Sequence, residues 1–202
     1  MGAGLIPCSI HNGKLYFLFG RENKYDDSYS NFWADFGGGT DKNETFIETA
    51  IREGTEELTG FLGSFDKIKK VLKKGTFNIE NTSEGFDTFR THIFPLEYDE
   101  QLPYYYNNNQ QFLQKKLDQN IIKKSKIFEK SEIKWFNIDE LIKRKKDFKK
   151  WYQAIINKII MNDHDIYKFI KQHSNSKTLG KTVKRKSRHN STFRRKKKIK
   201  AR

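Results

Sequence analysis

The sequence predicts an α/β protein in which a mixed sheet lies between layers of helices. Two short apolar runs near the N-terminus are joined by Asn12-Gly13, a pair that favours a tight hairpin turn. Apolar residues then recur at helical spacing over residues 45–58. Strand-like segments follow, and the chain continues into Ile-rich segments typical of helices that pack on a sheet.

The first half of the chain supplies the hairpin, a short strand and the first helix. Strands are expected at residues 4–10, 14–20 and 31–36, with a polar loop before the third strand. Three glycines are expected to break that third strand. The helix over residues 45–58 has Gly60 just past its end, a common stop signal.

The second half is expected to complete the sheet and cover it. Residues 65–80, 86–97 and 133–136 are interpreted as strands. Between the last two lies an insertion at about 99–128, rich in Tyr, Asn, Gln and Lys. Part of it, residues 109–123, is expected to form an amphipathic helix.

We expect one folded domain over residues 1–173, with a C-terminal helical extension at about 139–173. Residues 174–202 are interpreted as a disordered basic tail, because Ser, Asn, Thr and Lys replace the apolar residues there.

The positive charge is concentrated in that tail. The chain of 202 residues has a formal net charge of +15, and residues 174–202 contain thirteen Lys or Arg and no Asp or Glu, which leaves +2 for the rest. The charge therefore does not indicate a nucleic-acid-binding fold. RNA or DNA contact through residues 177–202, nuclear localisation and a solubilising extension all remain open for the tail.

Cysteine content and hydropathy limit the cellular compartments in which the protein is expected. Cys8 is the only cysteine, so no disulfide forms within the chain. The N-terminus does not have the pattern of a signal peptide, and no apolar run reaches the roughly 18 residues that a membrane span needs. We expect an intracellular protein, cytoplasmic or nuclear, that is neither secreted nor membrane-bound.

Three glutamates in the first helix carry the most chemical information. Glu53, Glu56 and Glu57 stand at positions i, i+3 and i+4, which places their carboxylates on one helical face. Three carboxylates held together repel one another, and a bound cation would offset that repulsion. Hard divalent ions prefer carboxylate oxygens as ligands. The same spacing taken alone also fits a solvated acidic surface.

The residues around these glutamates resemble the Nudix hydrolase signature, G-x5-E-x7-R-E-U-x-E-E-x-G-U, in which U is a bulky aliphatic residue. Six signature positions are matched at the required spacing by Gly38, Glu44, Arg52, Glu53, Glu56 and Glu57. The sequence departs at two structural positions, with Gly54 in place of an aliphatic residue and Thr59 in place of glycine.

The resemblance spans residues 4 to about 145, without the insertion. It includes an apolar strand that ends at Arg21-Glu22, the WADFGGG segment at 33–39 and the IKWFNIDEL segment at 133–141. It implies a Nudix-type α/β/α sandwich that hydrolyses a phosphoanhydride.

The resemblance also implies roles for individual residues. Glu53 and Glu57 would bind Mg²⁺ or Mn²⁺, and Glu56 would be a third ligand or help to deprotonate water. A backbone carbonyl near Gly38 would add a ligand, and Arg52 paired with Glu44 would orient the cluster. The ions would neutralise phosphate charge and lower the pKa of the attacking water.

A further carboxylate from a later loop is common in the family. Glu129, six residues before Trp135, is the first choice for the general base, with Glu132 next; a loop glutamate with no such role fits Glu129 equally well. Weaker alternatives are Glu97, Asp99 and Glu100.

Some other conspicuous residues have structural interpretations. His92 is expected to be a strand residue rather than a ligand, and Trp33 and Trp135 are expected in the core or at its rim. The tyrosines at 104–106 are expected to pack at the surface.

The sequence leaves three functions in competition. The first is hydrolysis of a nucleotide-type diphosphate, such as a nucleotide, nucleotide sugar or dinucleoside polyphosphate. The second is an RNA-directed enzyme, for example an mRNA-decapping hydrolase whose tail holds RNA. The third is a non-catalytic binding module.

Overall fold

A computed structural model of the chain describes residues 1–23, 31–82, 88–124 and 129–174. The expected polar loop before the third strand lies largely outside these residues, and so does the tail apart from Ser174. The boundary of the folded domain at residue 173 and the disorder of the tail therefore stay predictions.

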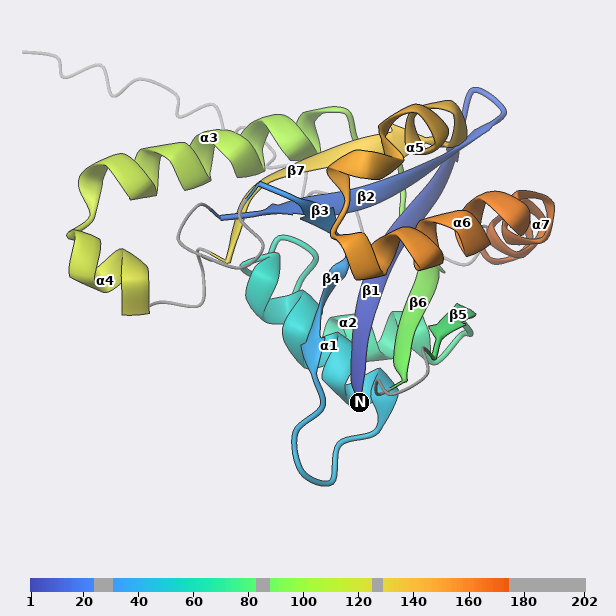
Figure 1. The fold of residues 1–202 in the computed structure, drawn as a ribbon, viewed down its shortest axis with the longest axis horizontal. Helices are drawn as coiled ribbons and strands as arrows, with labels where there is room; N and C mark the ends of the chain where they lie inside the picture. Colours follow the sequence, from blue (N-terminus) through green and yellow to red (C-terminus); the bar gives the residue numbers. More distant parts are fainter. Residues whose placement is uncertain (24–30, 83–87, 125–128, 175–202) are drawn as a thin grey trace, which may run out of the picture.

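A mixed sheet forms the centre of the fold (Figure 1). Its strands are β1 (Gly2–His11), β2 (Lys14–Glu22), β3 (Trp33–Ala34), β4 (Phe36–Gly39), β5 (Phe77–Asn81), β6 (Phe89–Pro95) and β7 (Lys130–Asn137). The hydrogen-bonded order is β3-β2-β1-β6-β5, with β4 pairing β1 and β7 pairing β2. β1 and β6 run parallel, whereas every other pair is antiparallel.

The N-terminal hairpin forms as expected. Asn12 and Gly13 have φ angles of 48° and 75°, and His11 pairs directly with Lys14. Two successive residues of positive φ match the twist of antiparallel strands, which is why Asn-Gly is favoured here.

Helices cover both faces of the sheet. They are α1 (Phe46–Glu57), α2 (Phe65–Leu72), α3 (Gln101–Lys116), α4 (Gln119–Lys124), α5 (Ile138–Arg144), α6 (Gln153–Met161) and α7 (Asp163–His173), with short 3-10 turns at Lys145–Asp147 and Lys150–Tyr152. None of the helices in the described part of the chain is long and apolar enough to cross a membrane.

Alternating strand residues divide the core into two clusters. On β1, Leu5 points into the cluster shared with α1, α2 and Tyr106 of α3, whereas Ile6 points into the cluster shared with α5, α6 and α7. Figure 1 shows α1 and α2 on the opposite side of the sheet from α6 and α7. The predicted α/β class, with a mixed sheet between helical layers, is confirmed.

Two local expectations are wrong. The glycines at 37–39 do not break the third strand: Asp35 interrupts it, and the glycines belong to β4, which pairs with β1. The second error concerns the strand expected at residues 65–80, because residues 65–72 form helix α2 instead. Ile68 and Leu72 are buried four residues apart, which is helical spacing.

A buried carboxylate lies where β3 gives way to β4. The Asp35 side chain accepts a hydrogen bond of 2.8 Å from Thr91 Oγ1 on β6, and Tyr152 also hydrogen-bonds it. A side chain at Gly4 would collide with the Asp35 carboxylate, so glycine is required for this close approach. Burial raises the pKa of Asp35 to about 6, although its hydrogen bonds and nearby lysines oppose the rise.

The pKa of Asp35 makes stability depend on pH. The folded chain keeps this proton to higher pH than the unfolded chain, whose carboxyl has the ordinary value of 3.8. The stability it contributes is therefore present below about pH 4 and is lost as pH rises through about 6. We expect Asp35→Asn to raise the free energy of unfolding by about 2 kcal/mol at pH 8 and to change little at pH 4. Urea unfolding at both pH values checks this, with Asp165→Asn on the surface of α7 as the control; equal effects at the two pH values would contradict it.

Candidate active site

Helix α1 begins with a capping box that fixes its first turn. Thr45 is the N-cap residue, and its hydroxyl accepts from the Glu48 backbone N–H while the Glu48 carboxylate accepts from the Thr45 N–H. These bonds satisfy two backbone donors that a helix start leaves open. The rotation of α1, and so the direction of each glutamate, is set from this end.

Arg52 joins the helix to the loop that precedes it. Its Nε and Nη2 donate to the two carboxylate oxygens of Glu44 at 2.8 and 3.0 Å, and Nη2 also reaches the Gly39 carbonyl at 3.0 Å. Nη1 donates to Glu53 Oε1 at 2.7 Å. The Arg52 guanidinium holds the pKa of Glu44 at about 2. One guanidinium thus fixes two carboxylates and a strand end.

Glu53 lies against the backbone of β4. A Cβ atom at Gly38 would come within 2.5 Å of Glu53 Oε1, so a larger residue there would force this carboxylate to move. The Glu53 side chain is 12% exposed. The Gly38–Glu53 contact explains physically why a glycine at position 38 and a glutamate at position 53 belong together.

Glu57 is buried deeper, one turn further along the same face. Lys130 Nζ lies 3.1 Å from Glu57 Oε1 and 2.5 Å from Glu22 Oε1. Lys149 adds a second cation at 2.7 Å from Glu22. Burial raises the pKa of Glu57, and the ammonium of Lys130 opposes that rise. The end of α1 is therefore a buried cluster of alternating charges.

The remaining predicted site residues lie in different surroundings. Glu56 is only partly buried. Glu129 precedes β7, and its negative charge is among the causes that raise the pKa of Glu57, which places it near the cluster. Glu132 instead pairs with Arg21 at 3.0 Å.

The weaker alternatives lie at or just before the start of α3. Glu97 and Glu100 are exposed, and Asp99 caps the backbone N–H of Gln101. His92 lies on β6 beside Asn78, with its Nδ1 2.8 Å from the amide oxygen, in agreement with a strand role.

The tryptophans and tyrosines mostly serve packing. Trp33 and Trp135 are 3% and 5% exposed and belong to the core. Tyr104 and Tyr105 are exposed, but the expectation of surface packing is wrong for Tyr106. That residue is fully buried, and its hydroxyl donates to the Glu57 carbonyl at 2.8 Å.

Sequence reasoning missed Lys130 and Lys149 and did not assign Glu22 a part in the site. Glu22 had a signal in the sequence, because the Arg21-Glu22 pair at the end of an expected strand is part of the resemblance to the Nudix family. A buried lysine has no comparable signal, because Lys130 lies in a charged stretch that reads as solvent-exposed.

The donor set suits a hard divalent cation, and two of its oxygens already hold partners. Glu57 Oε2 is buried and has no hydrogen-bond partner among the described residues. However, Glu53 Oε1 is bonded to Arg52 and Glu57 Oε1 to Lys130. Within residues 1–23, 31–82, 88–124 and 129–174, no three or more His, Cys, Asp or Glu side chains stand together as a metal-binding group. Carboxylate oxygens remain the ligands that Mg²⁺ and Mn²⁺ prefer.

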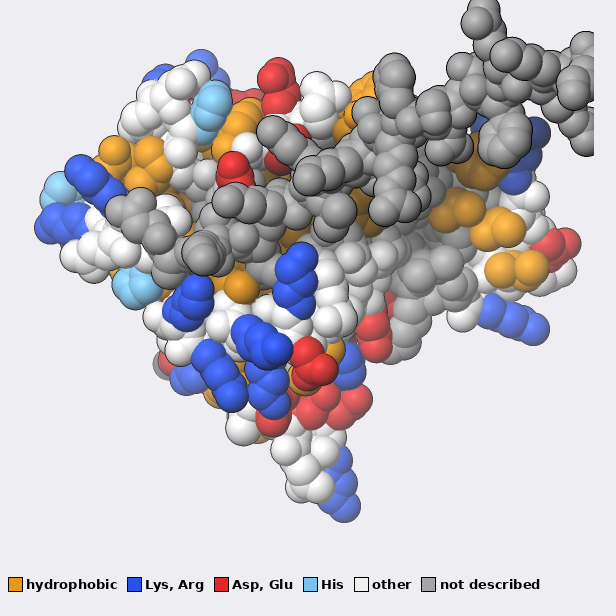
Figure 2. All heavy atoms as spheres, turned by 180° about the vertical axis from the view of Figure 1, so that it is seen from behind, with side chains coloured by type: hydrophobic (Ala, Val, Ile, Leu, Met, Phe, Trp, Pro, Cys, Tyr) orange, Lys and Arg blue, Asp and Glu red, His pale blue; other side chains and the backbone are white. Residues whose placement is uncertain are grey.

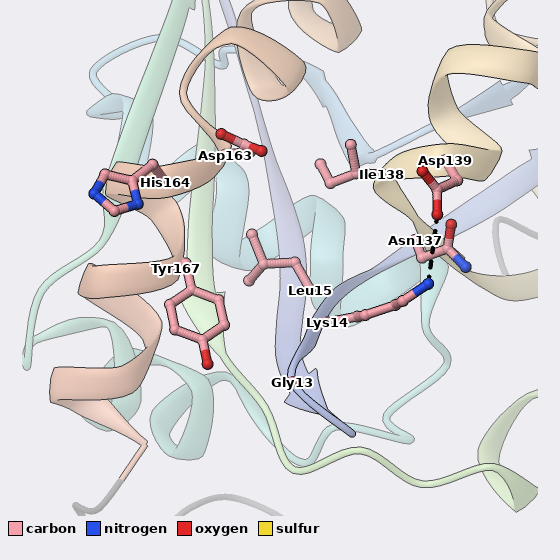
Figure 3. Close-up of a pocket in the computed structure, with 9 residues that line it drawn as sticks. All are labelled: Gly13, Lys14, Leu15, Asn137, Ile138, Asp139, Asp163, His164 and Tyr167. Atoms are coloured by element: carbon pink, nitrogen blue, oxygen red, sulfur yellow. Dashed lines mark ion pairs between the residues drawn. The ribbon is translucent and has the colours of Figure 1, made fainter.

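Among the cavities formed by the described residues, two lie away from the glutamates of α1. One of about 340 Å³ lies beside Glu44 and Phe46. The other, of about 440 Å³, lies between the hairpin turn and the starts of α5 and α7 (Figure 3). Lys14 and Asp139 pair across its rim at 3.5 Å. Because Lys14 and Glu22 are at opposite ends of β2, this cavity lies far from the charge cluster.

Comparisons with known proteins give similarity to Nudix structures. No family model matches the sequence. The uncharacterized protein L534 of Acanthamoeba polyphaga mimivirus is 37% identical over 67 residues, which is 33% of this chain and 22% of that protein, so the match spans about a fifth of the relative.

Among solved structures, an Ap4A hydrolase from C. elegans in a binary complex has 17% identity and a TM-score of 0.47, covering 81% of this chain and 97% of that one. The Nudix hydrolase RenU from M. smegmatis has 15% identity and a TM-score of 0.48, covering 82% and 86%. The Nudix domain of Shewanella oneidensis NrtR, complexed with ADP ribose, has 12% identity and a TM-score of 0.44, covering 82% and 86%.

The Arg52–Glu44 pair is expected to couple the loop to the helix. Both side chains are 21% exposed, so solvent screens the pair only in part. In a double-mutant cycle of Arg52→Gln and Glu44→Gln, we expect a coupling energy of about 1–2 kcal/mol in the free energy of unfolding. The surface pair Arg144–Asp147 supplies the control cycle and should give less than about 0.5 kcal/mol. A coupling energy for Arg52 and Glu44 no larger than that of the control would show that this ion pair does not couple the loop to the helix.

Proposed function

We propose that the chain is a Nudix-type hydrolase that uses Mg²⁺ or Mn²⁺ to cleave a phosphoanhydride bond in a nucleotide-type diphosphate. The observation that carries this proposal is the shared buried face of α1, on which Glu53 and Glu57 lie one turn apart and Glu53 lies against Gly38 of β4. The match of six residues to the Nudix signature gives this geometry its chemical interpretation.

The residues divide the work in the following way. Glu53, Glu56 and Glu57, with the backbone near Gly38, would hold the ion, which when bound supplies Lewis-acid chemistry at a phosphoryl oxygen. Arg52 keeps the Glu53 carboxylate turned toward β4, and Glu44 keeps Arg52 in place.

Glu129 is the proposed general base. A water oxygen forms a bond to phosphorus, the bridging P–O bond breaks, and the water proton moves to a Glu129 carboxylate oxygen. The electron pair of the broken bond stays on the departing phosphate. Proximity to Glu57 supports this assignment, because a base must lie beside the bound diphosphate.

Glu57→Gln tests the metal role with little change in shape. We expect the rate of diphosphate hydrolysis with Mn²⁺ to fall at least 100-fold and Mn²⁺ affinity to fall at least tenfold, because a neutral amide is a weaker ligand than a carboxylate. Rates are measured on a panel of nucleotides, nucleotide sugars and dinucleoside polyphosphates, with Mn²⁺ uptake followed by calorimetry.

Asp165→Asn, which removes a surface carboxylate of α7, is the control and should keep both rate and affinity. Full activity of Glu57→Gln would contradict the ligand role. Nucleotide binding without turnover by the unmodified protein would instead favour a non-catalytic binding module.

An RNA-directed enzyme is the second candidate, and the surface of α2 favours it. Figure 2 shows Lys and Arg side chains gathered over this helix. Five lysines lie in or just after it: Lys67, Lys69, Lys70, Lys73 and Lys74. Because α2 packs against α1, this basic surface adjoins the proposed catalytic helix and could attract the backbone of a nucleic acid.

The two candidates differ in their dependence on salt. For an RNA substrate held by Lys and Arg, we expect KM for capped RNA to rise at least tenfold between 50 and 200 mM salt, because counterions compete at the phosphates. KM for a small diphosphate should change much less. Capped-RNA kinetics on the full chain and on a chain ending at Ser174 separate the contribution of the tail from that of α2. No turnover of capped RNA at low salt would eliminate the second candidate.

A further inference from the structure

Lys130 is the most deeply buried cation of the described residues that form ion pairs. Its side chain is 1% exposed, and its ammonium lies between the carboxylates of Glu22 and Glu57. The two carboxylates are themselves 5% and 4% exposed. Transfer of charges from water into such a place costs several kcal/mol per ion unless each is paired.

The fold makes room for this lysine. A Cβ atom at Gly20, on the neighbouring strand β2, would come within 2.8 Å of Lys130 Cδ. The aliphatic stem therefore crosses β2 at a glycine and delivers the ammonium to the end of α1. Burial alone lowers the pKa of Lys130, but Glu57 and Glu22 outweigh it and raise the pKa above its usual range. The two carboxylates therefore favour the charged form of this lysine.

The Lys130 ammonium occupies one oxygen of the Glu57 carboxylate, which is a proposed metal ligand. Lys130 is bonded to Glu57 Oε1, whereas Glu57 Oε2 is buried without a hydrogen-bond partner among the described residues. A carboxylate with one oxygen neutralised and the other unsatisfied is suited to a second cation. A divalent ion that takes both oxygens must first displace the ammonium.

We propose that Lys130 is an internal cation that holds Glu57 in the metal-free protein and competes with a divalent ion for its carboxylate. Lys130 is then a positioning residue, and it sets the ion concentration at which the site fills. Glu22 is also required, because it keeps the Lys130 ammonium paired when the Glu57 carboxylate binds the divalent ion. This inference rests on the proposed metal-dependent function.

Mn²⁺ binding to Lys130→Gln tests the competition. We expect the dissociation constant for Mn²⁺, measured from the electron paramagnetic resonance signal of the free ion, to fall at least tenfold. The melting temperature without metal should fall, because a buried carboxylate loses its partner, and the rise on adding Mn²⁺ should exceed that of the unmodified protein.

Lys149→Gln is the matched control for net charge. It removes a cation from the same cluster, but the recorded ion pair of Lys149, at 2.7 Å, is with the Glu22 carboxylate, whereas Glu57 pairs with Lys130. A general electrostatic effect would tighten Mn²⁺ binding equally in both variants. Displacement from Glu57 predicts a change of less than about threefold in Lys149→Gln.

The double variant Glu22→Gln with Lys130→Gln guards against loss of folding. It removes one charge of each sign, so the cluster stays balanced while Glu57 loses its competitor. It too should bind Mn²⁺ at least tenfold more tightly than the unmodified protein.

The possible failures are distinguishable. If the unmodified protein binds Mn²⁺ and neither variant lacking Lys130 binds it more tightly than Lys149→Gln does, the competition is wrong and the metal site stands. If no form of the protein takes up Mn²⁺, both this inference and the proposed function are wrong.

Discussion

The buried glutamates of α1 depend on positive charge supplied by other parts of the chain. Glu53 takes it from Arg52 on the same helix, and Glu57 takes it from Lys130 at the start of β7. Without these cations, desolvation would neutralise the carboxylates or expel them from the core. The fold meets this requirement at two places. Gly38 of β4 leaves room for the Glu53 carboxylate, and the first residue of β7 brings Lys130 to Glu57.

The elements with strong periodicity could be predicted from the sequence. Asn12-Gly13 specified the hairpin because few residue pairs accept two positive φ angles, and the apolar spacing specified α1 because its buried face repeats every three or four residues. The same spacing placed Glu53 and Glu57 on one face. In contrast, α2 is only eight residues long, and its lysine-rich sequence obscured the two buried positions that define its face.

The charge partners could not be predicted in the same way. Lys130 lies more than seventy residues from Glu57 and more than one hundred from Glu22, so the cluster exists only after β7 has paired with β2. Asp35 and Thr91 are likewise brought together by the parallel pairing of β1 with β6 and the antiparallel pairing of β1 with β4. Local pattern carries no information about contacts of this range, whereas sheet register determines them.

The insertion contacts the helix that carries the glutamates, although its tyrosines were expected to pack at the surface. Tyr106 of α3 donates its hydroxyl proton to the backbone carbonyl of Glu57, one of the acceptors that the end of an α-helix leaves without an internal partner. The segment at 99–128 thus finishes the C-terminal end of α1 from outside. Excision of α3 in an engineered, shortened chain would uncap that helix at the residue whose carboxylate faces Lys130, so the segment should be treated as part of the framework rather than as a removable decoration.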